Sequence, residues 1–145
     1  MTCRDLMTEN PVYCTKSDIV VQPARLMRDE QVGPIPVVED PSSRRLIGIV
    51  TDRDLALKVV AEGRDPNSTR VEAVMTRDPI TCHPDDDVKE AMSAMEDHQL
   101  RRIPIVEDGD RLVGIIAQAD IARKKGKGDT AEVVKSVSEP QGKKH

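Results

Sequence analysis

The sequence predicts an α/β (α+β) protein made of two βαββα repeats, and three observations lead to that prediction. The chain matches itself at a shift of 68 residues, so that Leu6-Met7-Thr8 recurs as Val74-Met75-Thr76. Each copy carries an apolar stripe at helical spacing, followed by two β-branched runs joined by polar turn residues. Because a copy of about 50 residues is too short to bury its apolar faces alone, we expect the two copies to pack on each other.

Each copy begins with a short extended segment after a proline, at residues 12–14 and 80–82, and a helix follows it. In the second copy Asp85 or Asp86 is the predicted N-cap, since aspartate accepts hydrogen bonds from the free amides of a first helical turn. Apolar residues at the three-to-four spacing of a buried helix face form the two stripes, which are Val20, Ala24 and Met27 and then Val88, Met92 and Met95.

Two β-branched runs after the helix form a hairpin in each copy. The runs at 35–39 and 46–51 are joined by the polar residues 40–44, and the second hairpin has the tighter Asp108-Gly109 turn signal. In both copies the last strand leads directly into a helix, which in the second copy lies near 120–124. The predicted boundaries are repeat 1 at 6–60, a polar linker at 61–73, repeat 2 at 74–124 and a flexible C-terminal tail at 125–145.

Composition excludes several classes of protein. The chain has 145 residues, of which 37% are hydrophobic and 33% charged, and it has neither a membrane-length apolar run nor a secretory signal pattern, so we expect a soluble cytoplasmic protein without membrane contact. A net charge of −4 opposes binding to a phosphate backbone, so nucleic acid is not an expected partner. With one tyrosine, no tryptophan and no phenylalanine, any bound purine must lie between aliphatic side chains.

Cysteine and histidine give no strong metal or catalytic signal. Cys3, Cys14 and Cys82 form no CxxC pair, and their odd number argues against a disulfide framework, so we interpret them as small core residues. His83 and His98 occupy different parts of the repeat, although Cys82 beside His83 could contribute to a metal site. The sequence lacks a nucleophile with its base and lacks a P-loop, so we expect no enzyme activity, no catalytic residues and no metal site.

The repeated motifs resemble the CBS-domain family over most of the chain. Met75-Thr76 with Pro79, the runs that begin at Ile35 and Ile103, and the segment 48–54 (GIVTDRD) carry the resemblance, which is strongest to small stand-alone bacterial CBS-pair proteins. It implies two βαββα units that pack with pseudo-two-fold symmetry into a single disc-like module and leave two clefts. It also implies that AMP, ADP, ATP or a related adenosyl ligand binds in those clefts, with no cofactor required, and that the modules pair as homodimers.

Gly48, Thr51 and Asp54 match the family's ligand motif of glycine, a hydroxyl residue and aspartate at the strand-to-helix junction. A carboxylate can accept both ribose hydroxyls, and a helix N-terminus offers free N–H groups to a phosphate. Asp54 is therefore the predicted ribose acceptor. The alternative is that Thr51 or Asp52 caps the helix, as such residues commonly do.

The second copy keeps glycine and aspartate in this motif, as Gly114 and Asp120, but has Ala117 at the hydroxyl position, so we expect unequal sites. Either Gln118 substitutes as a donor, or the second cleft is weaker, empty or tuned to another ligand. An arginine pair, Arg101 and Arg102, is suited to phosphate, while the alternative is a solvated charge on an edge strand. The complete set of predicted ligand-binding residues is Val12, Ile35, Thr51, Arg53, Asp54, Arg101, Arg102, Ile103, Gln118 and Asp120.

Three functional hypotheses follow from the sequence. The first is a regulatory module that binds an adenine nucleotide and signals by conformational change to an unknown effector protein. The second is a protein-interaction module with vestigial clefts. The third is a thiol or metal sensor that uses Cys14, Cys82 and His83.

Overall fold

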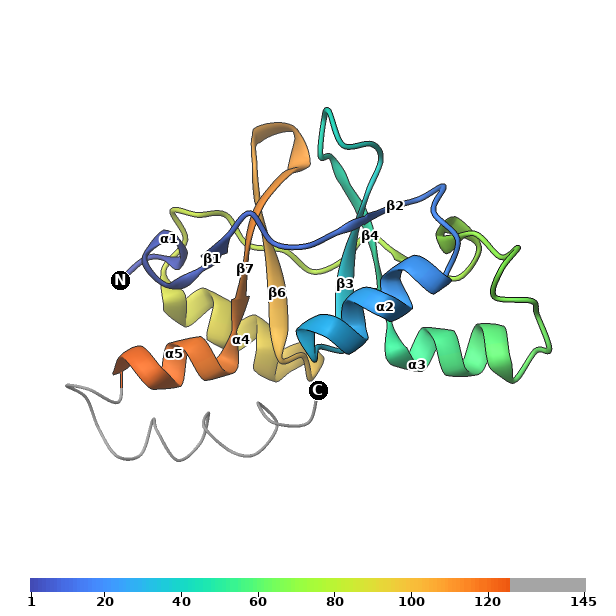
Figure 1. The fold of residues 1–145 in the computed structure, drawn as a ribbon. Coiled ribbons are helices and arrows are strands. Elements are labelled where there is room, and N and C mark those ends of the chain that lie inside the picture. The colour runs from blue at the N-terminus through green and yellow to red at the C-terminus, as the bar shows by residue number, and fades with distance from the viewer. Residues whose placement is uncertain (126–145) are drawn as a thin grey trace. The chain divides into compact units, whose positions relative to one another are not determined.

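The computed structural model describes residues 1–125 of the chain, which divide into two structural units. Each unit contains a β-sheet and helices. Among the described residues, unit 1 comprises Met1–Pro11, Ile80–Asp108 and residues 113–125. Unit 2 comprises Val12–Pro79 together with Gly109–Leu112. Figure 1 shows both sheets, with the strands of each unit lying side by side. The mixed helix and strand content confirms the predicted fold class.

Unit 2 contains a four-stranded sheet in the order β2-β3-β4-β5. β2 runs parallel to β3, and the other two pairs are antiparallel. In chain order its elements are β2 (Cys14–Thr15), α2 (Val21–Glu30), β3 (Pro34–Val38), β4 (Leu46–Thr51), α3 (Asp52–Leu55), the π-helix η1 (Ala56–Val60), the 3-10 helix η2 (Val71–Ala73) and β5 (Thr76–Arg77).

Unit 1 contains a three-stranded sheet in the order β1-β7-β6. Of the extended segment predicted at 80–82, Cys82 alone forms a bridge, which is parallel to Ile105. In chain order the elements are α1 (Cys3–Leu6), β1 (Thr8–Glu9), α4 (Val88–His98), β6 (Arg102–Glu107), the 3-10 turn η3 (Asp108–Asp110), β7 (Arg111–Ala117) and α5 (Gln118–Lys125). Gly109–Leu112, at the end of η3 and the start of β7, belong to unit 2.

The short segments that begin each sequence repeat pair with the sheet of the other repeat. Thr8, from before the first repeat's helix, pairs with Ile115 of β7. Its repeat equivalent, Thr76, pairs with Ile49 of β4. The structural units therefore divide the chain differently from the sequence repeat. The predicted tail at 125–145 lies, apart from Lys125, outside the described residues.

The predicted apolar stripes lie where helices meet the sheets. Val20 and Met27 are buried in the core of unit 2, and Val88 and Met95 are buried in the core of unit 1. The fully buried Val37 of β3 faces the same core as Val20. The middle residues of the two predicted stripes, Ala24 and Met92, are half-buried. Burial of one apolar helix face against the sheet stabilises each unit.

The predicted N-cap of the second helix was wrong by one or two residues. The cap of α4 is Asp87, whose carboxylate accepts the Lys89 N–H at 2.9 Å, while Glu90 accepts the Asp87 N–H at 3.2 Å. Asp86 instead accepts the His83 N–H at 2.8 Å. Three consecutive aspartates are equally good caps by composition, and the capping box with Glu90 decides among them.

The polar segment predicted as a linker is an ordered part of unit 2. The carboxylate of Asp65 accepts the Asn67 N–H at 2.9 Å, and the Thr69 carbonyl accepts the Val20 N–H at 2.9 Å. The second bond, together with a bridge between Ile19 and Arg70, attaches the end of this segment to the start of α2. No helix among residues 1–125 is both long and apolar enough to cross a membrane.

Candidate ligand-binding site

In unit 2, Thr51 and Asp54 lie at the junction of β4 and α3, where the sequence placed them. Thr51 is the N-cap of α3 in an extended conformation, and its Oγ1 accepts the Asp54 N–H at 3.1 Å. Asp54 Oδ2 accepts the Thr51 N–H at 2.9 Å, and Asp54 Oδ1 lies 3.1 Å from Lys58 Nζ. Both carboxylate oxygens of this buried aspartate therefore have protein partners.

The capping alternative thus describes Thr51, and Asp54 completes a capping box. Asp52, the other candidate cap, does not cap the helix: its Oδ1 accepts the Arg53 N–H at 3.0 Å, and both residues are exposed. Each carboxylate oxygen of Asp54 has a second lone pair, so the predicted ribose contact is compatible with this geometry. Lys58 was missed by the sequence analysis, although its i+4 spacing from Asp54 is a usable signal.

Gly33 is held close to the first turn of α3. The Asp52 N–H donates to the Gly33 carbonyl at 3.1 Å, and a Cβ at Gly33 would lie 3.1 Å from Asp52 Oδ1. The repeat-equivalent bond in unit 1 runs from the Gln118 N–H to the Arg101 carbonyl at 2.9 Å. In both units the start of the last helix is thereby attached to the chain just before the central hairpin.

In unit 1 this junction places the Asp120 carboxylate near the Arg102 guanidinium, and Gln118 is the first residue of α5. Asp120 is half-buried, with 21% of its side chain exposed, and it pairs with Arg123. Burial lowers the pKa of the half-buried Arg102 guanidinium, and the nearby Asp120 carboxylate opposes that shift. A guanidinium group that has lost hydration in this way favours contact with an anion.

Gln118 Oε1 is the one buried side-chain oxygen or nitrogen in the described part of the chain that has no hydrogen-bond partner. The donor role predicted for Gln118 would use its side-chain N–H groups and stays a prediction. The unpaired atom is the oxygen of the same amide, which is an acceptor and needs an N–H or O–H partner. Buried acceptors are rarely left unpaired, because the lost hydration costs about 1–3 kcal/mol.

The predicted aliphatic contacts for a base divide into core and surface residues. Ile35 and Ile103 are fully buried in the cores of their units, and their ligand contacts stay a prediction. Val12 is 37% exposed and accessible to a ligand. Arg101 is exposed, and Arg102 is partly shielded.

All three cysteines are buried free thiols, which confirms their interpretation as core residues. Cys14 belongs to unit 2, whereas Cys82 and His83 belong to unit 1. Residues 1–125 hold no cluster of three or more His, Cys, Asp or Glu side chains that could bind a metal ion.

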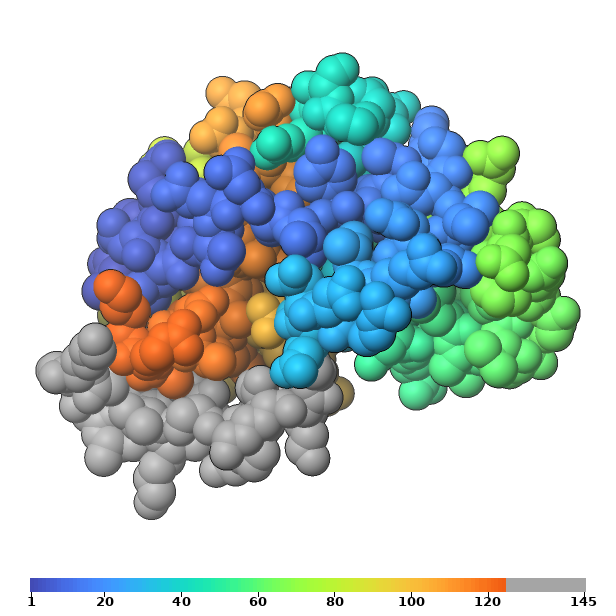
Figure 2. All heavy atoms as spheres, viewed as in Figure 1, coloured from blue at the N-terminus to red at the C-terminus, as the bar shows by residue number. Residues whose placement is uncertain are grey.

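Unit 2 also has a pocket of about 260 Å³ that the sequence did not indicate. It lies between α2 and the segment that carries α3 and η1, which are adjacent on the surface in Figure 2. Its lining is apolar apart from two arginines of α2, and it consists of Val20, Val21, Ala24, Arg25, Arg28, Leu55, Val59, Val60 and Pro66. None of the predicted ligand-binding residues lines it.

Comparison with known proteins identifies the family. The CBS domain model matches the chain twice, at residues 3–61 and 71–127. The chain belongs to the CBS-domain family. The two matches form a tandem pair, as the sequence repeat predicted.

Among the relatives of this chain, YlbB of Bacillus subtilis is 43% identical over 119 residues, covering 82% of this chain and 78% of its own. Hypoxic response protein 1 of Mycobacterium tuberculosis is 34% identical over 140 residues, covering 96% and 95%. A crystal structure of the hypoxic response protein with two coordinated zinc ions matches 85% of this chain and 98% of its own, with 33% identity and a TM-score of 0.77.

A second solved structure is the CBS domain pair of protein MJ0100 in complex with 5-methylthioadenosine and S-adenosyl-L-methionine. It is 27% identical to this chain and has a TM-score of 0.73, with 86% of this chain and 98% of the MJ0100 chain covered. The CBS pair thus supports adenosyl-ligand binding in that relative.

Proposed function

We propose that this CBS pair is a non-catalytic regulatory module that binds an adenosyl ligand through Arg102, Gln118 and Asp120 and signals through a separate effector protein. The unpaired Gln118 Oε1 carries the proposal. A buried acceptor without a donor is a cost to the free protein, and a ligand N–H or O–H group would remove that cost. The complex of MJ0100 with two adenosyl compounds supports the ligand class.

The three groups match different parts of such a ligand. Asp120 keeps part of its carboxylate exposed and can accept ribose hydroxyl groups. Gln118 Oε1 can accept a hydroxyl or the exocyclic amine of adenine. Arg102, partly dehydrated, can bind a phosphate or a carboxylate in a bidentate arrangement. The same ligand class in unit 2 would use Thr51 and Asp54, without an arginine at the position of Arg102, where the first copy has Pro34.

Calorimetric titration with AMP, ADP, ATP, S-adenosylmethionine, 5-methylthioadenosine and GMP tests the proposal. At a ligand concentration of 100 times Kd, the free energy of unfolding should rise by about 2.7 kcal/mol. Asp120→Asn should weaken binding about tenfold or more, while Asp108→Asn, at an exposed aspartate of the same unit, should not change it.

Gln118→Leu separates binding from folding. The variant removes an acceptor that has no partner, so the free protein should be at least as stable as the wild type, whereas ligand affinity should fall. The proposal fails if no adenosyl compound binds at millimolar concentration. It also fails if Gln118→Leu leaves the affinity unchanged.

We further propose that the protein forms a homodimer through the apolar surface beside α2. Leu57 and Val60 of η1 are 47% and 76% exposed, and Val60 lines the pocket described above. Exposed apolar side chains around an apolar hollow favour a protein contact. Light scattering should give twice the monomer mass, and Val60→Asp should give the monomer. The control Val12→Asp, at an exposed valine outside this pocket, should keep the mass of the dimer. If Val60→Asp also keeps that mass, the dimer contact does not include this surface.

A further inference from the structure

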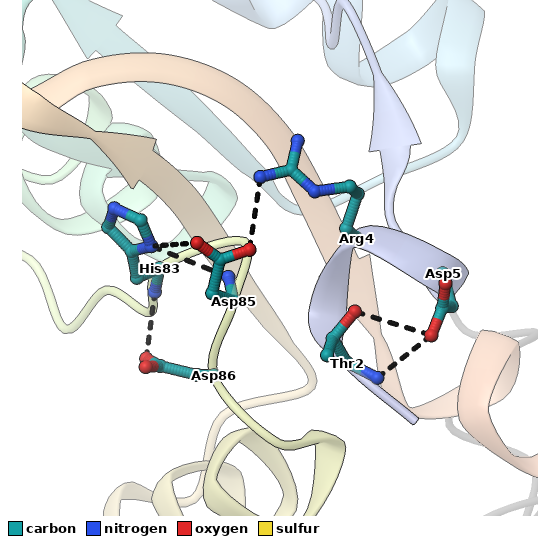
Figure 3. A network of polar contacts seen from close by, with 6 residues as sticks. All are labelled: Thr2, Arg4, Asp5, His83, Asp85 and Asp86. Carbon is teal, nitrogen blue, oxygen red and sulfur yellow. Dashed lines mark hydrogen bonds and ion pairs between the residues drawn. The ribbon is translucent and has the colours of Figure 1, made fainter.

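The N-terminal helix α1 is attached to the segment that follows Cys82. The Cys3 N–H donates to the Asp86 carbonyl at 2.9 Å, and the Arg4 N–H donates to the Pro84 carbonyl at 2.9 Å. Figure 3 shows Arg4 reaching Asp85, with 3.2 Å between Arg4 Nη2 and Asp85 Oδ1. Two chain segments that are far apart in sequence are thus held together within unit 1 by backbone bonds and one ion pair.

The same contact places two thiols against each other. Cys3 is fully buried and Cys82 is 7% exposed, and both belong to the core cluster of unit 1. A side-chain hydrogen bond joins the two sulfur atoms. The Cys82 backbone is fixed from the other side, because its N–H donates to the Pro104 carbonyl at 3.1 Å and its carbonyl accepts the Val106 N–H at 2.9 Å.

We propose that Cys3 and Cys82 are a redox-active pair that a peroxide converts to a reversible disulfide, which covalently joins α1 to the second repeat. The inference goes beyond the proposed ligand binding and does not rest on it. The third cysteine, Cys14, lies in unit 2 and takes no part.

The hydrogen bond makes the two thiols unequal. A bond donated by the Cys3 thiol lowers the pKa of Cys82, against the opposing effects of burial and of the Asp86 and Glu90 carboxylates. The same bond and burial raise the pKa of Cys3. Because the thiolate is the nucleophile, Cys82 is the residue that reacts first and Cys3 is the one that resolves the product.

The chemistry balances with hydrogen peroxide as the oxidant. The Cys82 thiolate attacks one peroxide oxygen, the O–O bond breaks, and the released hydroxide takes up a proton to leave as water, giving a sulfenic acid. The Cys3 sulfur then attacks the sulfenic sulfur, the S–O bond breaks, and the hydroxyl group leaves as a second water with the proton of the Cys3 thiol. Two thiols lose two electrons in total, and one peroxide gains them.

Cys82 is 7% exposed whereas Cys3 is fully buried, so a small oxidant such as hydrogen peroxide meets Cys82 first. Helix α1 has only four residues, and a short helix opens locally at less cost than global unfolding. Once formed, the disulfide would prevent that opening. Oxidation would therefore fix α1 against the segment that follows Cys82.

Peptide mapping of the full chain tests the pair directly, because trypsin places the three cysteines in separate peptides, 1–4, 5–16 and 78–89. After treatment of the reduced protein with hydrogen peroxide and alkylation in denaturant, peptides 1–4 and 78–89 should be joined, and Cys14 in peptide 5–16 should be alkylated. Dithiothreitol should restore all three thiols. Cys14→Ser should form the disulfide at the wild-type rate, whereas Cys3→Ser should accumulate Cys82 sulfenic and sulfinic acids.

Wild-type mapping decides the question even if a cysteine variant fails to fold. A link between peptides 5–16 and 78–89 would overturn the proposal, as would sulfinic acid at Cys82 with a free Cys3 thiol. The proposal would also be overturned if all three thiols of the folded protein stayed unmodified at a peroxide concentration that oxidises the chain unfolded in urea. A joined 1–4 and 78–89 pair that dithiothreitol releases would establish it.

Discussion

Gly48 leaves room for the edge strand β5, and replacing it with alanine should destabilise unit 2. A Cβ at Gly48 would lie 2.8 Å from the Thr76 carbonyl oxygen and 2.9 Å from Met75 Sδ. Favourable contacts of carbon begin at about 3.5 Å. The methionine tip can rotate away, but the carbonyl belongs to the backbone of β5 and can move only if β5 leaves β4, to which it is paired at Gly48↔Arg77 and Ile49↔Thr76.

The expected cost follows from these contacts. Overpacking of this kind costs about 1–3 kcal/mol, and weakening one or two edge-strand hydrogen bonds adds about 1 kcal/mol. Alanine in a strand regains about 0.5–1 kcal/mol over glycine. The net loss in free energy of unfolding should therefore be about 2 kcal/mol, or a Tm lower by roughly 4–8 °C.

Urea denaturation followed by circular dichroism measures this loss, and Gly33→Ala is the matched control. The nearest atom to a Cβ at Gly33 is the carboxylate oxygen of exposed Asp52 at 3.1 Å, which can turn into solvent, so that variant should lie within about 0.5 kcal/mol of the wild type. If Gly48→Ala denatures at the wild-type urea concentration, or no earlier than Gly33→Ala, the close approach of β5 does not constrain this position.

Three further predictions concern helix capping, the core and a buried thiol. Asp87→Ala should cost about 1 kcal/mol of folding free energy in urea denaturation, because α4 loses its cap. The control Asp85→Ala removes an exposed ion pair and should cost less than about 0.5 kcal/mol, so equal costs would contradict the assigned cap. Met95→Ala should cost about 2–5 kcal/mol in the same assay, since its side chain is 1% exposed, and a smaller loss would mean that the core of unit 1 collapses around it. Burial raises the pKa of Cys14 from 9.0 to about 12, so the unfolded chain loses this proton first and the free energy of unfolding should fall as the pH rises from 9 towards 12. Cys14→Ala should lose less stability over that interval. Parallel plots of unfolding free energy against pH for the two proteins would refute the shift.

Features with a strong local period could be predicted from the sequence. The stripes through Val20 and Met27 and through Val88 and Met95 repeat at helical spacing, and the hairpin strands are β-branched runs, so their positions follow from local chemistry. The strands β1 and β5 could not be placed in this way. They have two residues each, and which sheet they join depends on contacts with residues far away in the sequence.

The candidate site also contains some features that the sequence could predict and others that it could not. The junction of Thr51 and Asp54 was predictable because the motif is short and local, but its capping geometry depends on which oxygen meets which amide. The unpaired state of Gln118 depends on what surrounds it in three dimensions, which no spacing encodes. The contact of Cys3 with Cys82 likewise joins residues that nothing in the linear pattern connects.

The strands β1 and β5 each pair with the sheet of the other repeat, and this pairing has a consequence for biosynthesis. β1 leaves the ribosome early, yet its partner β7, paired at Thr8↔Ile115, follows about a hundred residues later, a delay of roughly 5–20 s at ordinary elongation rates. β2 to β5 all emerge within that interval. The nascent chain should therefore complete the sheet β2-β3-β4-β5 first, while β1 stays unpaired until β7 has been synthesised.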